Sequence, residues 1–202
     1  MNVGVLASGV GTNLQALIDH AHGTDHVSLR AVASDKLRAP ALDRAHRAGI
    51  DAEVFPADRF PDRDARDAAM GDWLAERGVE LVVLAGYMQL LSPRFLATFP
   101  NRVINIHPAL LPAFPGLGAI QQALDYGVKV FGVTVHFVDQ GVDSGPVILQ
   151  RAIELPDARS VDEVLAPLHE VEHELLVEAV TLIARGAVDL DPANPRRVVI
   201  SR

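Results

Sequence analysis

Apolar runs rich in β-branched residues alternate along this chain with segments whose apolar residues recur every three to four positions. The first pattern is typical of buried strands and the second of amphipathic helices. The patterns predict strands at residues 2–7, 27–34, 52–55, 81–85, 103–107, 130–138 and 147–153, with a last strand-like run at 197–200. They predict helices that begin near residues 12 and 93 and helices at residues 39–48, 62–77, 120–126 and 160–184.

This alternation of strands and helices predicts an α/β fold, with a doubly wound, mostly parallel sheet of about seven strands and helices on both faces. The segment Leu81–Ala85 is apolar at every position, as a strand covered on both faces must be. A chain of 202 residues can form one such domain with a continuous core. We therefore expect a single domain, 1–202, whose role changes near residue 100.

The strand Val103–His107 carries the most informative polar residues. Pro108 cannot donate to a sheet ladder, so this strand is expected to end at His107. Asn105 and His107 then leave the same face, at the end of the strand where α/β folds bind ligands. An amide beside an imidazole can stabilise an oxyanion and move a proton. A lone histidine here would more often be structural, but the in-register Asn105 and the rigid loop after Pro108 favour catalysis.

A glycine-rich turn, Ser8-Gly9-Val10-Gly11-Thr12-Asn13, follows the first strand. Thr12 and Gln15 fit a capping box, which predicts a helix that begins near Thr12. Free N–H groups and the positive end of such a helix bind phosphate. Leu14 replaces the third glycine of a dinucleotide fingerprint, and no Gly-Lys-Ser/Thr of a P-loop follows. The turn predicts a phosphate site, and a purely structural strand-to-helix turn is the alternative.

Other polar and apolar residues stand at unusual positions. Glu172 falls on the apolar stripe of the last long helix, between Leu168 and Leu175, where a carboxylate must be paired or used. The apolar segment Gly86–Leu91 after the strand 81–85 either covers a flat ring ligand or packs into the core. His136, within an alternating strand, is expected to be structural.

Composition narrows the classes of function. The chain has no cysteine, which excludes disulfides, a cysteine nucleophile and thiolate metal sites. Its net charge is −8 and it has no run of basic residues, so nucleic-acid binding is not expected. No apolar stretch approaches the roughly 18 residues of a membrane span, and the N-terminus does not resemble a signal peptide. We expect a cytoplasmic protein without membrane or nucleic-acid partners. The sequence leaves open whether the protein forms a homodimer.

The segment His169-Glu170-Val171-Glu172-His173 matches the H-E-x-x-H pattern of zinc proteases. Zinc needs a third protein ligand, and no histidine follows in the chain. Leu176 also stands where the extended protease motif has glycine. A match over five residues is weak, so we expect no metal site.

Several motifs together resemble the folate-dependent formyltransferases, in unbroken order from Val3 to about Ile183. They are Asn105-Ile106-His107-Pro108, Leu110-Leu111-Pro112, Pro115-Gly116, the turn Val142–Ile148 with Asp143, and the opening glycine loop. The resemblance implies an enzyme that transfers a formyl group from 10-formyltetrahydrofolate, its co-substrate, to the amino group of 5-phosphoribosylglycinamide, in purine synthesis. Its partners would be small-molecule substrates.

The resemblance also implies roles for single residues. Asn105, His107 and Asp143 would be catalytic, with His107 as general acid and Asp143 orienting its ring. The phosphoribosyl substrate would be bound by Gly11, Thr12, Asn13, His169 and Glu172. The folate would be bound by Arg63, Met88, Gln89, Leu90, Leu91, Asn105, Asp139, Gln140, Gly141, Val142 and Asp143. Residues 1–100 would form the phosphate-binding half, and 101–202 the catalytic and folate-binding half.

Two departures from the family pattern concern the binding residues. Gln89 stands where some relatives have a basic residue, and Gly118-Ala119-Ile120 where close relatives often have histidine. Two other functions remain: a formyltransferase acting on a sugar-nucleotide amine, and a non-catalytic sensor of a phosphorylated ligand. The trio Asn105, His107 and Asp143 argues against a sensor. The glycine loop argues against a bulky nucleotide.

Overall fold

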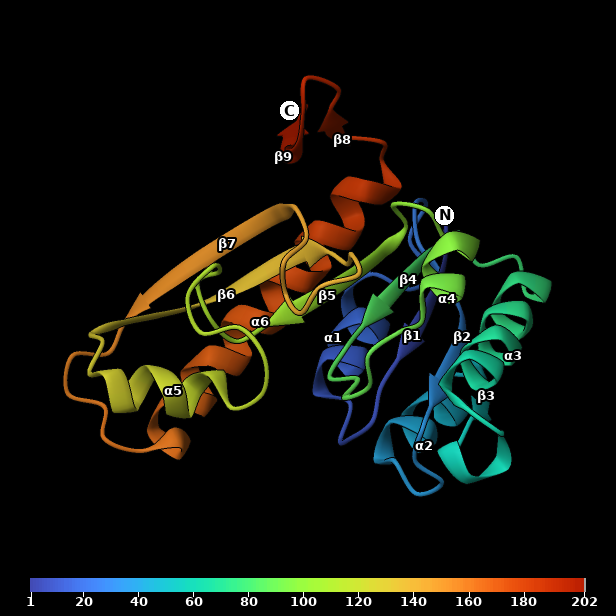
Figure 1. The fold of residues 1–202 in the computed structure, drawn as a ribbon, viewed down its shortest axis with the longest axis horizontal. Coiled ribbons are helices and arrows are strands. Elements are labelled where there is room, and N and C mark those ends of the chain that lie inside the picture. Colours follow the sequence, from blue (N-terminus) through green and yellow to red (C-terminus); the bar gives the residue numbers. More distant parts are fainter. Residues whose placement is uncertain (202) are drawn as a thin grey trace. The chain divides into compact units, whose positions relative to one another are not determined.

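The computed structural model describes residues 1–201 (Figure 1). The chain separates into two compact units, Met1–Asn105 and a second unit that begins at Ile106. Each unit is described by itself. The prediction that residues 1–202 form one domain stays a prediction.

The first unit is an α/β sheet in which all strands are parallel. Its strands have the order β3-β2-β1-β4-β5. The elements are, in chain order, β1 (Asn2–Leu6), α1 (Thr12–His20), β2 (Ser28–Ser34), α2 (Pro40–Arg47), β3 (Asp51–Val54), the 3₁₀ turn η1 (Ala57–Arg59), α3 (Arg63–Glu76), β4 (Leu81–Leu84), α4 (Pro93–Thr98) and β5 (Val103–His107).

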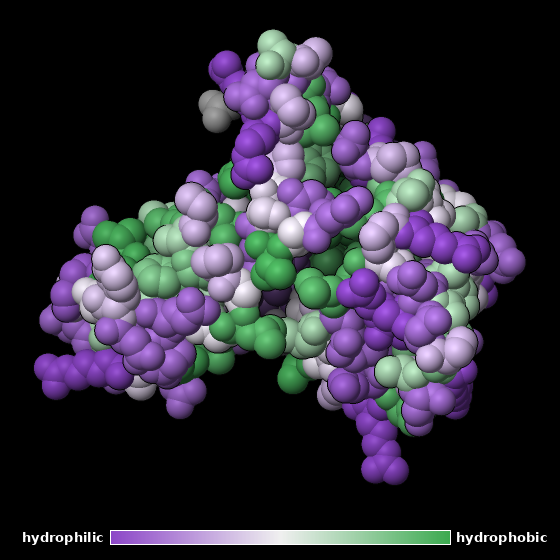
Figure 2. Space-filling view, viewed as in Figure 1, coloured by the Kyte–Doolittle hydropathy of each residue, from purple (hydrophilic) through white to green (hydrophobic). Residues whose placement is uncertain are grey.

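Both faces of this sheet are covered. Every residue of β4 is buried, as its uninterrupted apolar sequence predicts. Side chains alternate between the two faces of a strand, so helices or loops must lie on each face. On one face, Gly4 of β1 leaves room for Leu74 of α3: a Cβ at Gly4 would lie 2.9 Å from a methyl carbon of Leu74. The outer surface over α3 is mostly hydrophilic (Figure 2).

The second unit is built on the antiparallel pair β6 (Val130–Phe137) and β7 (Val147–Glu154). The long helix α6 (Val161–Ala184) packs against both strands and against α5 (Ala119–Tyr126). The predicted stripe of α6 is buried, including Val164, Leu168, Leu175, Ala179 and Ile183. The unit ends in the hairpin β8 (Val188–Asp191) and β9 (Asn194–Ile200).

The strand order β3-β2-β1-β4-β5-β6-β7 confirms the prediction of a mostly parallel, seven-stranded α/β sheet, with one antiparallel pair. The chain moves outward from β1 to β3 and then returns to place β4 on the other side of β1. The order of strands therefore reverses between β1 and β4. Ligands of such folds bind at the carboxyl ends of the strands beside this reversal.

One local prediction is wrong and another is incomplete. Helix α1 does begin at Thr12, but its N-cap is Gly11, in the left-handed conformation, and no side chain caps the helix. The capping box of Thr12 and Gln15 is therefore absent, and the Gln15 amide donates instead to Asp19. The strand-like run 197–200 is part of a longer hairpin whose first strand was not predicted. Among residues 1–201, no helix has the length and apolar character to span a membrane.

A buried ion pair within α3 of the first unit is hydrogen-bonded to the start of α4. The guanidinium of Arg66 donates through Nε and Nη2 to Oδ1 of Asp67, at 2.9 and 2.7 Å. The other carboxylate oxygen, Oδ2, accepts the backbone N–H of Ser92 at 2.6 Å. Arg66 and Asp67 are 3% and 0% exposed, so water does not compensate either charge.

We predict that Asp67→Ala destabilises the protein strongly, because it leaves the buried Arg66 cation and the Ser92 N–H without their acceptor. Removing one partner of a buried ion pair costs about 3–5 kcal/mol. Urea unfolding of the variant measures this loss. Asp64→Ala, at an exposed position in the first turn of the same helix, is the control and should cost less than about 1 kcal/mol. Equal losses in both variants would contradict a stabilising role of the pair.

Candidate active site

The turn at residues 139–146, between β6 and β7, holds Asp143 in place. Oδ1 of Asp139 accepts hydrogen bonds from the Gly141 N–H at 2.9 Å and the Ser144 hydroxyl at 2.6 Å. The Phe137 N–H donates to the Pro146 carbonyl at 2.9 Å and closes the turn. A Cβ at Gly145 would overlap the Phe137 carbonyl, so only glycine fits there. These contacts within the turn do not involve the Asp143 side chain, so they fix the turn independently of it.

The Asp143 carboxylate contacts three groups of the second unit. Its Oδ2 accepts the Gly116 N–H at 2.7 Å and lies 3.3 Å from Nδ1 of His107. Its Oδ1 lies 3.6 Å from Nε2 of His136. The carboxylate is 14% exposed, and the residue has a positive φ of 48°. Asp tolerates this conformation better than most residues, but it is uncommon and needs such contacts to persist.

These contacts lower the pKa of Asp143. Burial alone would raise it, because burial disfavours the charged form. The His136 side chain, the Gly116 N–H and the charges of His107 and His136 outweigh burial and lower the pKa from 3.8 to about 2. The carboxylate is therefore ionised throughout the neutral range and is a fixed negative charge beside two imidazole rings.

The His107 ring has an acceptor at each nitrogen. Nε2 lies 2.8 Å from the Phe114 carbonyl oxygen, and because a carbonyl only accepts, Nε2 carries a proton there. Nδ1 faces Asp143. A ring that carries a proton on both nitrogens can donate to both of these acceptors. The ring is 4% exposed, so its orientation is set by these contacts and not by water.

The loop that supplies the Phe114 carbonyl is itself anchored to α5. Its Leu117 and Pro115 carbonyls accept the Gln122 side-chain amide at 2.9 and 3.3 Å. The Phe114 ring packs edge-on against Tyr126, with centroids 5.9 Å apart. Phe114 also has a positive φ of 54°, which is rare for a bulky residue. This conformation turns the loop so that its carbonyl meets His107.

Asn105 is the last residue of the first unit and is half-buried. It stands two positions before His107 on β5, whose bounds are those predicted from the sequence. Alternation along a strand sends these two side chains to the same face. Within the first unit, Asn105 near the end of β5 and the glycine loop after β1 lie at the same edge, because the strands between them are parallel.

The glycine loop of the first unit depends on Gly11. This residue has φ 75°, and a Cβ there would lie 2.7 Å from the Ala41 Cβ. Arg44 on α2 braces the loop from beside it: Nε donates to the Val10 carbonyl at 2.9 Å and Nη1 to the Gln15 side chain at 2.8 Å. Thr12 is half-buried and Asn13 is buried. The Arg44 guanidinium therefore lies beside the loop and the first turn of α1.

Glu172 is buried, at 7% exposure, as its place on the stripe predicts. Oε2 of Glu172 lies 4.0 Å from Nε2 of His169, one turn earlier. The His169 and His173 rings stack, with centroids 6.1 Å apart. No group of three or more potential metal-binding side chains is gathered among residues 1–201. The H-E-x-x-H pattern therefore finds no third ligand in the described part of the chain.

The residues assigned to the folate lie on loops of both units. In the first unit, Met88 and Leu90 are 61% and 55% exposed, Leu91 is half-buried, and Arg63 is exposed. Gln89 donates to Oδ2 of Asp35 at 3.3 Å. In the second unit, the turn residues Asp139, Gln140, Gly141 and Val142 are exposed.

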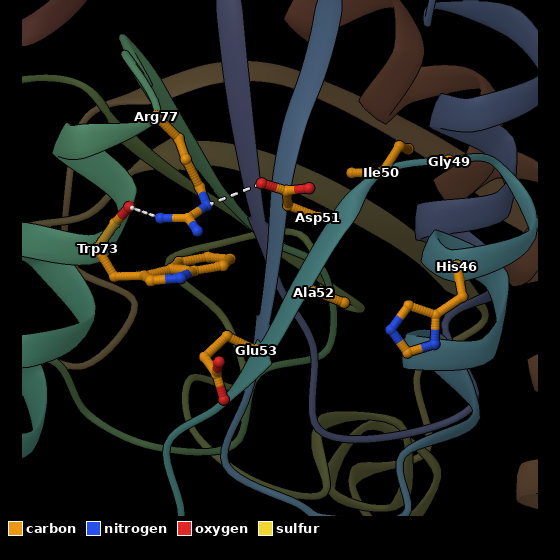
Figure 3. A pocket seen from close by; sticks show the side chains of 8 residues that line it. All are labelled: His46, Gly49, Ile50, Asp51, Ala52, Glu53, Trp73 and Arg77. Carbon is orange, nitrogen blue, oxygen red and sulfur yellow. Dashed lines mark hydrogen bonds and ion pairs between the residues drawn. The ribbon is translucent and has the colours of Figure 1, made fainter.

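A surface hollow of about 470 Å³ in the first unit lies beside the edge strand β3 (Figure 3). The Arg77 guanidinium covers the Trp73 ring at 4.1 Å and pairs with the Asp51 carboxylate at 3.1 Å. None of the predicted site residues lines this hollow. The Arg77 side chain already contacts Trp73 and Asp51, so we do not assign the active site to this hollow.

Three contacts of the predicted site were not found from the sequence. His136 was expected to be structural, yet it faces the Asp143 carboxylate. The Gly116 N–H and the Phe114 carbonyl are backbone groups, which no pattern of side chains identifies. The only sequence signal for these backbone contacts was the pair Pro115-Gly116, which indicated a tight loop.

We predict that Asp143 stabilises the folded protein above pH ~4 and that this contribution is lost as the pH falls towards 2. The folded pKa of about 2 lies below the ordinary 3.8, so the folded state binds this proton less readily than the unfolded state. The shift corresponds to roughly 2 kcal/mol at neutral pH. The difference in unfolding free energy between the wild type and Asp143→Asn should shrink as the pH falls from ~5 towards 2. The exposed Asp157→Asn is the control. A difference independent of pH down to ~2 would contradict the prediction.

Comparison with known proteins shows the family of the chain. Residues 1–180 match the family model described as formyl transferase. The chain is 39% identical to phosphoribosylglycinamide formyltransferase of Haemophilus influenzae, over 93% of this chain and 89% of that protein. It is 40% identical to the trifunctional purine biosynthetic protein adenosine-3 of Bos taurus, over 93% of this chain but only 19% of that much longer protein.

Among solved structures, the chain is similar to glycinamide ribonucleotide transformylase 1 from Symbiobacterium toebii. The TM-score is 0.95 and the identity 46%, over 100% of this chain and 94% of that one. The family match covers most of the chain, and the relative from Haemophilus influenzae is matched over nearly its whole length. The chain therefore belongs to the formyl transferase family.

Proposed function

We propose that this protein transfers a formyl group from 10-formyltetrahydrofolate to the amino group of 5-phosphoribosylglycinamide, in purine biosynthesis. Membership of the formyl transferase family and the names of its relatives support the reaction. The observation that carries the proposal is the His107 ring, buried and fixed between the Asp143 carboxylate and the Phe114 carbonyl. A ring oriented in this way is suited to give a proton to a single position.

In the proposed mechanism, the amine attacks the formyl carbon and the carbonyl electrons move to oxygen. Asn105, through its amide N–H, and protonated His107 stabilise the resulting oxyanion. The intermediate collapses when the bond from carbon to N10 of the folate breaks. N10 replaces the Phe114 carbonyl as the acceptor of the Nε2 proton of His107 and takes that proton. The attacking nitrogen releases a proton, which returns through water to the ring. The Asp143 carboxylate stabilises the charged ring and fixes its orientation.

The phosphoribosyl substrate is proposed to bind at the glycine loop. The first turn of α1 leaves backbone N–H groups without partners in the helix, and these attract a phosphate. Gly11, Thr12 and Asn13 would hold the phosphate and the adjoining ribose, with the Arg44 guanidinium adding positive charge beside them. Glu172, supported by His169, would accept hydrogen bonds from the ribose hydroxyls.

The folate is proposed to bind through Met88, Gln89, Leu90 and Leu91 and the turn at residues 139–143, with Asn105 facing its formyl group. Arg63 would pair with the glutamate tail. No step of this reaction needs a metal ion. A cytoplasmic location, the absence of membrane and nucleic-acid partners, and a homodimer remain predictions.

A transfer assay with the purified protein tests the proposal. The two substrates together should yield formylated phosphoribosylglycinamide and tetrahydrofolate. A sugar-nucleotide amine in place of phosphoribosylglycinamide should give no product, because the short glycine loop suits a single phosphate. Formylation of the sugar-nucleotide amine but not of phosphoribosylglycinamide would support the alternative transferase. Binding of phosphoribosylglycinamide without any formylated product would support a sensor.

We predict that His107→Ala lowers turnover by ~10²–10⁴-fold, the usual effect of removing a positioned acid. Both substrates should still bind, because other residues hold them. Steady-state kinetics at pH 7 measure the loss. His20→Ala, an exposed histidine in the last turn of α1, is the control and should leave turnover unchanged. Retention of more than half of the wild-type turnover by His107→Ala would refute the mechanism.

We predict that Glu172→Gln raises the KM for phosphoribosylglycinamide about tenfold or more, because hydrogen bonds to a charged acceptor are worth about 1.5–3 kcal/mol. The KM for the folate should change little. Glu170→Gln, exposed on the same helix, is the control. If Glu172 is instead only a structural partner of His169 or His173, the substitution will lower the melting temperature and leave both KM values alone.

A further inference from the structure

The turn that carries Asp143 is also held from the far end of the second unit. Nη2 of Arg196, on β9 of the last hairpin, donates to the Ser144 carbonyl oxygen at 2.9 Å. Ser144 directly follows Asp143, and it lies 52 positions before Arg196 in the chain. β9 also packs against β7, the strand that begins just after the turn. The hairpin therefore contacts the backbone beside the carboxylate that faces His107.

The hairpin itself directs Arg196 to this carbonyl. The Arg196 N–H donates to Oδ1 of Asn194 at 3.1 Å, which fixes the backbone from which the guanidinium extends. The next residue, Arg197, pairs instead with Asp191 of β8, at 3.9 Å. Two neighbouring cations thus have different partners: Arg197 binds within the hairpin, and Arg196 reaches the turn.

Asp143 needs support from the residue that follows it. Its φ of 48° is an uncommon conformation, and such a conformation persists only when several surrounding contacts hold it. The residue before it, Val142, is exposed and gives little support. On the other side, Gly145 packs so closely against the backbone of Phe137 that a Cβ there would overlap it. Arg196 adds a contact from outside the turn, to the carbonyl of the peptide group that joins Ser144 to Gly145.

We propose that Arg196 is a positioning residue for formyl transfer, which fixes the Ser144 peptide group and so keeps the Asp143 carboxylate against the His107 ring. The inference rests on the proposed function. Without the guanidinium, the peptide group can rotate, and the contact of 3.3 Å between Oδ2 of Asp143 and Nδ1 of His107 is no longer fixed. The chemical step then slows, because a small displacement of a catalytic group lowers the rate.

The test is single-turnover formyl transfer with both substrates saturating. Arg196→Ala should lower the rate by about three- to tenfold, the range expected for one lost hydrogen bond. The KM for phosphoribosylglycinamide should not change, because its proposed contacts lie elsewhere. Added guanidinium ion, far below the concentration that unfolds the protein, should restore part of the lost rate. Arg197→Ala is the matched control and should show neither the loss nor the rescue.

A double variant tests whether Arg196 acts through Asp143. In the Asp143→Asn background, Arg196→Ala should lower the rate little further, because the carboxylate that it positions is already gone. Losses of rate that multiply in the double variant would overturn the proposal.

A purely structural role gives a different result. Arg196 is exposed, so the variant is expected to fold, and melting curves check this. If Arg196→Ala lowers the melting temperature but keeps the wild-type rate well below that temperature, the proposal is wrong. An equal loss of rate in Arg197→Ala would also overturn it. Failure of the proposed function is distinct, because the wild type would then transfer no formyl group at all.

Discussion

The buried carboxylate of Asp143 is the charge on which the chemistry of the second unit depends. One of its oxygens accepts the Gly116 N–H at 2.7 Å and faces His107, and the other faces His136. These contacts more than offset the cost of burial, which is why the pKa falls to about 2 and does not rise. The same contacts link the hairpin turn to the loop that carries the Phe114 carbonyl. A change at Asp143 therefore alters both the charge beside His107 and the position of the groups around it.

The first unit depends on a different constraint, which is that its strands are parallel. Parallel strands place the loops after β1, β2 and β4 at one edge, and the reversal of strand order beside β1 leaves that edge open to a ligand. Gly11 permits the sharp entry into α1 because a side chain there would collide with Ala41. The exposed apolar side chains of Met88 and Leu90 lie at the same edge, together with the exposed cations Lys36 and Arg38.

The sequence predicted what depends on periodicity and local chemistry. The strand Val103–His107 was predicted to the residue, because β-branched residues begin it and Pro108 ends it. The burial of Glu172 followed from its helical spacing. The backbone groups around His107 could not be predicted, because the Phe114 carbonyl and the Gly116 N–H act through space and not through a pattern of side chains. Gly11 was missed as the N-cap for a related reason: a positive φ depends on the packing of Ala41 against the turn.

The central claim is that Asp143 holds His107 in the state that delivers a proton to the folate nitrogen. Single-turnover formyl transfer by Asp143→Asn, with both substrates saturating, tests it most directly, because binding and product release do not contribute to the rate. The account predicts a rate at least about 10²-fold below that of the wild type, since the amide neither stabilises the charged ring nor fixes its orientation. A rate within twofold of the wild type would contradict the account.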